Sequence, residues 1–258
     1  MLNARGIAYE YHNGGPQAAG FPPVVFIHGA AGSRLFWPPV MRRLGGVEVY
    51  AIDLPGHGAS GGEGRSSIEG YAEAVGAWMG AIGMRRAVCA GHSMGSAIAL
   101  ELALSSPDLL AGLILVGGGA SLRVNPALLE LSASVATARQ AMSLVLEWSF
   151  GSTAPSRLVG LAGRRMADVP ARVLHDDLEA CSQFDVRPAI AGIRLPALIV
   201  CGAEDRMTPP KLSQALAEAL PRNRLQLVPG AGHMVMLEQP EAVVGAIRQF
   251  LAASFPPL

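Results

Sequence analysis

The sequence has no excess charge of either sign and no long apolar run. Twenty Lys and Arg side chains balance twenty Asp and Glu side chains, so the formal net charge is zero. Without a basic excess, nothing favours nucleic acid or an anionic membrane surface as a partner. The most apolar segments, such as residues 113–116 and 195–201, are far too short to span a bilayer. We therefore expect a partner that is a small molecule, with the oligomeric state, monomer or dimer, left open.

Cysteine is scarce as well. The chain has three cysteines, an odd number, and Cys89 and Cys201 fall inside apolar segments that are predicted core strands. This pattern predicts reduced, buried thiols and not a disulfide framework. Residues 1–12 alternate like a strand and lack the basic segment and long apolar segment of a secretory signal. We therefore expect a cytoplasmic protein.

Short apolar strands alternate with helical patterns along most of the chain. With 258 residues and 50% hydrophobic content, the chain fits one large α/β domain better than two independent ones. The alternation predicts a mostly parallel sheet of about eight strands, with helices on both faces and an antiparallel edge hairpin from the first residues. Strands are expected near 24–28, 47–52, 87–92, 112–116, 197–201 and 224–228. Helices are expected near 66–82, 94–105, 209–219 and 240–253, with Pro209 and Pro240 as first helical residues.

One region interrupts the alternation of strands and helices. Between Val116 and Pro196 lie helical patterns with no strand between them, first after Asn125-Pro126 and then around 156–167 and 171–183. This indicates a small helical cap, residues 120–187, inserted after the sixth strand of a core formed by 1–119 and 188–258. Apolar cap residues either line a pocket or form the cap's own core.

The pentapeptide Gly91-His92-Ser93-Met94-Gly95 joins a predicted strand to a predicted helix. A serine on such a sharp turn is exposed, and the flanking glycines allow strand and helix to approach closely. The amide of Met94 would lie at the helix N-terminus, where an unsatisfied N–H and the helix dipole stabilise an oxyanion. The pattern predicts Ser93 as a nucleophile for acyl transfer.

A serine nucleophile needs a base, and the base needs an orienting group. His233 follows the Gly-rich turn Pro229 to Gly232, after a predicted strand. Asp205 follows another predicted strand, in the turn Gly202-Ala203-Glu204-Asp205. We predict Ser93, Asp205 and His233 as a catalytic triad, with the adjacent Glu204 as the alternative acid.

The order Ser, Asp, His resembles that of the α/β-hydrolase fold superfamily. The resemblance extends to His28-Gly29-Ala30-Ala31-Gly32-Ser33, similar to its oxyanion loop, and to Asp53-Leu54-Pro55-Gly56-His57-Gly58-Ala59-Ser60, similar to its turn after the next strand. It implies the α/β-hydrolase fold, a second oxyanion-hole amide from Ala30, and a cap that supplies much of the substrate pocket. Candidate pocket residues are Phe36, Leu122, Trp148, Phe150 and Met234.

Departures from the family patterns narrow the reaction. Serine at position 93, where dehalogenase and epoxide hydrolase relatives carry aspartate, disfavours an alkyl-enzyme route, and the loop is not the Gly-rich HGGG type. No cofactor is implied. We reject a metal site at His175-Asp176-Asp177, because adjacent helical residues point in different directions. Four cap arginines could bind a substrate carboxylate, although most are expected on a solvated face: Arg164, Arg165, Arg172 and Arg187.

The leading hypothesis is a carboxylesterase for small to medium, mainly apolar esters. The alternatives with the same triad are a carbon-carbon bond hydrolase acting on dienoic ring-fission products, an enol-lactonase and a perhydrolase. Carbon-carbon hydrolysis would be favoured by an arginine that points at Ser93. A ligand receptor with vestigial hydrolysis is the alternative from another class, since fold does not fix function.

Overall fold

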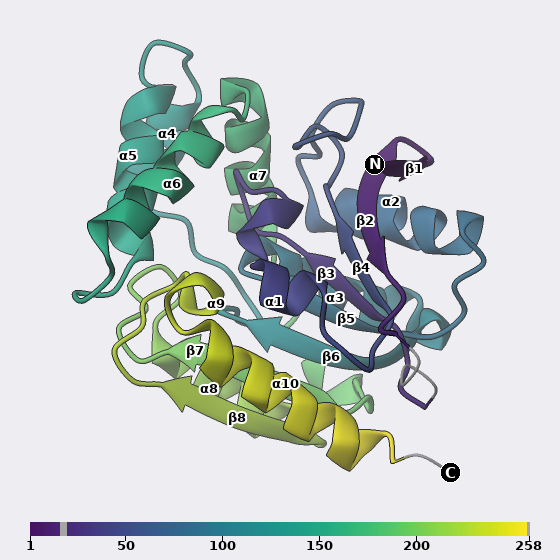
Figure 1. Cartoon of the computed structure of the whole chain (residues 1–258). Coiled ribbons are helices and arrows are strands. Elements are labelled where there is room, and N and C mark those ends of the chain that lie inside the picture. The colour runs from purple at the N-terminus through teal and green to yellow at the C-terminus, as the bar shows by residue number, and fades with distance from the viewer. Residues whose placement is uncertain (16–19, 257–258) are drawn as a thin grey trace.

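The computed structural model describes residues 1–15 and 20–256, and it contains one eight-stranded sheet (Figure 1). The strand order is β1-β2-β4-β3-β5-β6-β7-β8, and every pairing from β4 onwards is parallel. The predicted antiparallel edge hairpin is confirmed, because β1 pairs with β2 and β2 with β4 in antiparallel fashion. The strands are β1 (Leu2–Ala4), β2 (Ile7–His12), β3 (Val24–Ile27), β4 (Val49–Ile52), β5 (Ala87–His92), β6 (Leu110–Val116), β7 (Ala197–Gly202) and β8 (Asn223–Val228).

The central strands are buried on both faces, and their sequences show it. Every residue of β3, β5, β6 and β7 is buried. This is why these strands are continuous apolar runs in the sequence and not alternating patterns. The edge strand β8 has only one buried residue, Val228. The three cysteines are buried and unpaired, as predicted.

Helices cover the two faces of the sheet in separate hydrophobic clusters (Figure 1). One cluster packs α2 (Ile68–Ala81), α3 (Met94–Ser105) and α8 (Pro210–Ala219) on one face, and the other packs α1 (Pro39–Arg42), α9 (Val235–Glu238) and α10 (Pro240–Ser254) on the opposite face. Pro240 is the first residue of α10, as predicted. The prediction for Pro209 was wrong by one residue: it precedes α8, and Pro210 takes the first helical position.

Four further helices follow β6 and precede β7, with no strand of the sheet between them. They are α4 (Pro126–Ser132), α5 (Ala138–Ser149), α6 (Ser156–Ala167) and α7 (Ala171–Gln183). In Figure 1, α4, α5 and α6 lie together at the upper left, and α7 stands beside them, towards the middle of the molecule. Within the described residues, no helix combines the length and apolarity needed to cross a membrane.

Candidate active site

Ser93 occupies a sharp turn between β5, which ends at His92, and α3, which begins at Met94. Its backbone lies in the left-handed region, with φ 53° and ψ −117°. A non-glycine residue in such a conformation costs on the order of 1–3 kcal/mol and is characteristic of functional sites. The glycines on either side are required by close approach. A Cβ on Gly91 would lie 2.0 Å from the Gly95 carbonyl oxygen, and one on Gly95 would lie 2.3 Å from the Ile27 carbonyl oxygen.

Two backbone amides beside Ser93 are available to an anion. Met94 is the first residue of α3, where the amides have no partner within the helix. Ala30 lies in the loop after β3 and lines the same cavity as Ser93. Within the described part of the chain, neither amide donates a backbone hydrogen bond in a turn, loop or helix cap. Ala30 therefore shares a cavity with Ser93, and Met94 follows Ser93 directly in the chain.

Asp205 and His233 meet at the carboxyl ends of β7 and β8. Oδ2 of Asp205 lies 2.9 Å from Nδ1 of His233, and both side chains are almost completely buried. Oδ1 accepts hydrogen bonds from the amides of Met207, at 2.9 Å, and Thr208, at 2.8 Å. Burial raises the pKa of Asp205, but the His233 charge and the hydrogen bonds from His233 and Thr208 outweigh burial and lower it overall. Asp205 is therefore ionised and fixed against the imidazole.

Glu204, the alternative acid, points elsewhere. Its Oε2 accepts a 2.7 Å hydrogen bond from the amide of Ser152, in the segment after α5. That contact lowers the pKa of this exposed carboxyl. Of the two adjacent acids, Asp205 is the one in contact with His233.

His92 anchors the backbone of His233 from the other side. Burial, together with the neighbouring His233, lowers the pKa of His92 to about 3, so its ring is neutral. Nε2 of this neutral ring lies 3.0 Å from the His233 carbonyl oxygen, to which it donates.

The loop that carries Ala30 is held by buried polar groups. The Leu54 amide donates to Nε2 of His28 at 3.0 Å, and Nδ1 of His28 donates to the Gly29 carbonyl at 2.8 Å. Burial and the neighbouring His57 lower the pKa of His28 to about 3, consistent with a neutral ring that both accepts and donates. The fully buried Asp53 accepts from the Arg34 amide at 2.7 Å and pairs with the Arg34 guanidinium.

A cavity of about 220 Å³ lies between the sheet edge and helices α4 to α7. Ser93 and His233 line it together with four of the five predicted pocket residues: Phe36, Leu122, Trp148 and Met234. Apolar side chains of α4 to α7 also line it: Leu128, Val145, Met166, Leu174 and Leu178. Phe150 is not part of the described lining. It follows α5 in extended backbone, with φ −113° and ψ 146°, which turns its side chain into the hydrophobic core.

The arginines at the cavity are not the ones that the sequence singled out. Arg123, after β6, and Arg206, next to Asp205, line the cavity. The four predicted cap arginines do not line it. Three of them contact protein groups elsewhere: Arg165 donates to the Leu35 carbonyl, Arg172 lies near Glu63 and Asp176, and Arg187 pairs with Asp185. Arg123 and Arg206 were missed because neither belongs to a helical pattern of the cap.

The side chains of His175, Asp176 and Asp177 contact three different partners. His175 lies 2.9 Å from the Ser132 hydroxyl, Asp176 lies near Arg172, and Asp177 contacts His57. They do not converge on one point, as their adjacent positions on a helix predict. The sequence analysis did not predict the buried contact between Asp177 and His57. No local signal marks a single buried carboxylate on an amphipathic helix.

The fold and the site together define a hydrolase of the α/β-hydrolase fold. Residues 24–246 match the model of the alpha/beta hydrolase family, and the chain belongs to that family. It is similar to the RutD protein of Caulobacter sp. (strain K31), whose name proposes a carbamate hydrolase, with 30% identity over 96% of each chain. It is also similar to the pimeloyl-[acyl-carrier protein] methyl ester esterase of Neisseria meningitidis, with 29% identity over 88% of this chain and 76% of the relative. A solved thermophilic esterase is 31% identical, with a TM-score of 0.82 over 98% of this chain and 96% of that chain.

Proposed function

We propose that the protein is a carboxylesterase that works through an acyl-enzyme on Ser93. In this mechanism Ser93 Oγ attacks the ester carbonyl carbon while Nε2 of His233 takes its proton. The tetrahedral intermediate collapses, the C–O bond to the alcohol breaks, and His233 returns the proton to the leaving alkoxide. Water then attacks the acyl-enzyme by the same proton transfers and releases the acid.

The observation that carries this proposal is the contact between Asp205 and His233 beside a cavity that Ser93 also lines. A carboxylate on Nδ1 holds the proton there, which leaves Nε2 as the acceptor for the serine proton, and it stabilises the imidazolium that forms. The strained turn at Ser93 presents its hydroxyl to the same cavity. These features have no structural need without a reaction at Ser93.

The amides of Ala30 and Met94 are proposed as the oxyanion hole. Each removed donor of this kind typically costs roughly 3 kcal/mol of transition-state stabilisation. Because the backbone supplies both donors, the side chains at these positions are free to vary.

The cavity supports small to medium, mainly apolar substrates. Ligand sites are usually concave and apolar with a few polar groups at the reacting end, and this cavity has that character. Trp148 and Met166 contribute to its apolar lining from α5 and α6. The names of the similar esterases support the same class of reaction.

The experiment that tests the proposal is hydrolysis of p-nitrophenyl esters from acetyl to dodecanoyl, with Ser93→Ala as the matched blank. We expect turnover that peaks at short or medium chains and falls by on the order of 10⁶ in kcat in the folded variant. Activity of Ser93→Ala within tenfold of the parent would contradict the proposal. Slow single-turnover acylation of the parent would instead support a receptor.

A second candidate keeps the triad and changes the substrate. Arg123 and Arg206 line the cavity with Ser93, and the Arg206 guanidinium donates to the Glu147 carbonyl oxygen. An arginine at the cavity favours a substrate that carries a carboxylate. This favours a carbon-carbon bond hydrolase for dienoic acids, or an enol-lactonase. Failure of the whole ester series, in a protein whose Ser93 still reacts with a fluorophosphonate, would support it. A second supporting result would be a higher KM for an acidic substrate, but not for a neutral one, in Arg123→Gln or Arg206→Gln.

The proposal needs no metal or cofactor, because protein groups supply the nucleophile, the base and the oxyanion donors. Activity should therefore survive dialysis against EDTA unchanged.

A cytoplasmic location and a small molecule as the partner also remain part of the proposal. Fractionation of the producing cells tests the location directly.

A further inference from the structure

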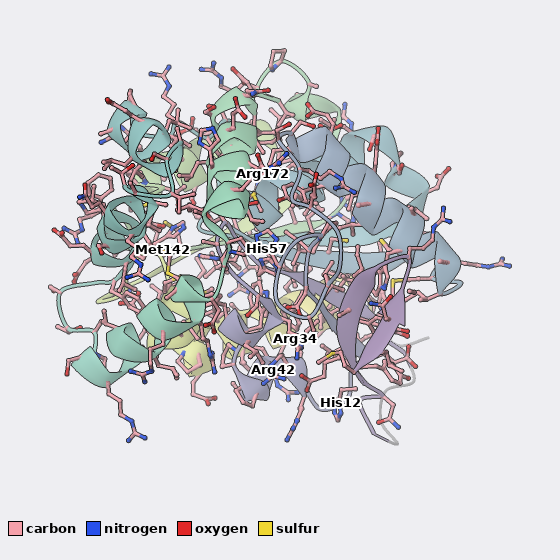
Figure 2. The ribbon with its side chains drawn as sticks, turned by 90° about the horizontal axis from the view of Figure 1, so that it is seen from above. His12, Arg34, Arg42, His57, Met142 and Arg172 are labelled. Atoms are coloured by element: carbon pink, nitrogen blue, oxygen red, sulfur yellow. The ribbon has the colours of Figure 1, made fainter. Side chains whose placement is uncertain are left out.

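Helix α7 carries one completely buried carboxylate, Asp177, which points towards the loop that contains Ala30. Oδ2 of Asp177 accepts a 2.8 Å hydrogen bond from the amide of Ala31 and lies 2.9 Å from Nε2 of His57. Oδ1 accepts a 2.5 Å hydrogen bond from the Tyr71 hydroxyl of α2. Figure 2, seen from above, places His57 near the middle of the molecule beside the ribbon of α7, whose first turn carries the labelled Arg172. Asp177 therefore joins three separate parts of the core to α7.

The pair formed by Asp177 and His57 is ionic. Nδ1 of His57 lies 3.0 Å from the Pro55 carbonyl oxygen and Nε2 faces Asp177, so both ring nitrogens face acceptors. A ring in this position needs two N–H groups, which only the imidazolium has. Burial lowers the pKa of His57, but the Asp177 charge and the two hydrogen bonds outweigh it and raise the pKa overall. The buried carboxylate thus has both a counter-charge and a full set of donors.

The contact with Ala31 bears directly on the oxyanion loop. Ala31 has φ 51°, a left-handed backbone conformation that non-glycine residues seldom adopt. Its amide belongs to the peptide group that follows Ala30, so a hydrogen bond to a fixed carboxylate sets the backbone direction at Ala30. The Gly32 amide, which donates to the Gly29 carbonyl at 3.1 Å, closes the turn from the other side.

We propose that Asp177 is a positioning residue for the oxyanion hole. The Ala30 amide is then aligned only while α7 is docked on the core. This rests on the proposed function, in which Ala30 supplies an oxyanion donor. The consequence is that the helices covering the cavity do more than shape the substrate pocket. When α7 is docked, the hole is formed; when α7 is displaced, the peptide after Ala30 loses its buried acceptor.

The test compares Asp177→Asn with Asp176→Asn in the full-length protein. The two changes remove one charge from adjacent residues of the same helix, but the Asp176 carboxylate faces Arg172 at 3.8 Å and not the oxyanion loop. We expect Asp177→Asn to lower kcat by about 10²-fold with KM within about threefold, because a misplaced donor weakens only transition-state binding. Asp176→Asn should stay within about twofold of the parent. The kcat is calculated per active site, and the active sites are counted by complete titration with a fluorophosphonate. Unfolded protein does not react and is therefore not counted.

A second readout separates positioning from a purely structural role. A trifluoromethyl ketone forms an oxyanion on the serine, whereas the product acid binds without one. Asp177→Asn should weaken the ketone by about 10²-fold and leave the affinity of the acid unchanged. Equal weakening of both ligands, or an unchanged kcat per titrated site, would overturn the inference.

A milder variant covers the case in which Asp177→Asn does not fold. Tyr71→Phe removes the bond to Oδ1 and the hydroxyl's contact with the Arg65 backbone, but keeps the Ala31 and His57 contacts of Asp177. A threefold to tenfold loss in kcat at constant KM is the result we expect. A kcat equal to that of the parent would overturn the inference. Ser93-dependent turnover of the parent is measured first. If it is absent, the proposed function fails together with this inference; if it is present and Asp177→Asn matches the parent, this inference fails alone.

Discussion

Nδ1 of His233 lies 2.9 Å from Oδ2 of Asp205, although 28 residues separate them in the chain. The Thr208 hydroxyl completes a triangle with them, 3.1 Å from Nδ1 of His233 and 2.9 Å from Oδ2 of Asp205. The Gly117 carbonyl oxygen lies 2.8 Å from the same hydroxyl, as a second acceptor for its single proton. The imidazole is therefore held in one orientation by two residues of the loop after β7, and Thr208 of that loop also contacts the loop after β6.

Asp205→Asn should lower kcat by about 10⁴, because the amide favours the wrong imidazole tautomer. Glu204→Gln is the matched control, since it removes the neighbouring charge without touching His233, and it should stay within about threefold of the parent. Both are measured by steady-state kinetics on the best p-nitrophenyl ester. If Glu204→Gln is the damaging change, the acid has been assigned wrongly.

Thr208→Val should lower kcat by about tenfold at constant KM. Valine has nearly the same shape, so the change removes the hydroxyl contacts to Asp205 and His233, and about 1.4 kcal/mol corresponds to tenfold in rate. Thr153→Val is the control, because its exposed hydroxyl contacts only the Gly230 carbonyl, at 3.4 Å. Equal kcat values for the two variants would show that Thr208 does not orient the pair.

Gly91→Ala should destabilise the fold by about 3 kcal/mol or more. The new Cβ would lie 2.0 Å from a backbone oxygen of Gly95, and the turn between β5 and α3 cannot open without moving the sheet. Gly80→Ala is the control within α2, where a Cβ meets nothing within 4 Å, and it should be neutral or stabilising by about 0.5–1 kcal/mol. Urea unfolding of both variants gives the comparison, and an unchanged midpoint for Gly91→Ala would refute this account of the turn.

The buried neutral histidines should make the fold sensitive to acid. The unfolded chain protonates His92 near its ordinary pKa of 6.5, but the folded chain holds that pKa at about 3. Between these values the unfolded state binds more protons, so the free energy of unfolding falls as the pH decreases below 6.5. This contribution is fully present above pH 6.5.

His92→Asn removes one such group and keeps a side-chain N–H that could reach the His233 carbonyl. From pH 6.5 to 5.0 the loss of unfolding free energy should be smaller in this variant by roughly 2 kcal/mol, at about 1.4 kcal/mol per pH unit. Urea unfolding at the two pH values measures the difference. Parallel losses in parent and variant would mean that His92 is not held neutral.

Much of the architecture was predictable because its signals are local. The continuous apolar runs predicted the buried strands, and the helical patterns at 156–167 and 171–183 predicted α6 and α7 with the bounds that the structure shows. The short helices α1 and α9 were missed, since four residues are too few for a periodicity to appear. Strand β4 was predicted two residues too early, at Val47 and not Val49.

The candidate site likewise has residues that the sequence predicted and residues that it did not. Ser93, Asp205 and His233 each follow a strand, and the carboxyl ends of parallel strands meet at one edge of the sheet, so their proximity could be expected from their order. Phe150 was assigned to the pocket because apolar residues of the cap look alike in sequence. Arg123, Arg206 and Thr208 had no pattern of their own.

The sequence by itself determined the strand and helix pattern, the strained turn at Ser93 and the identity of the residues around it, because these depend on short-range backbone preferences and on periodicity. Only the tertiary structure decided which side chains face the cavity and which carboxylate accepts a hydrogen bond from the Ala31 amide. Asp177 and the Ala31 amide are 146 residues apart, and their contact depends on how α7 packs against α3 and meets Tyr71 of α2. A contact of that kind is fixed by the packing of whole elements, which no local stretch of the sequence encodes.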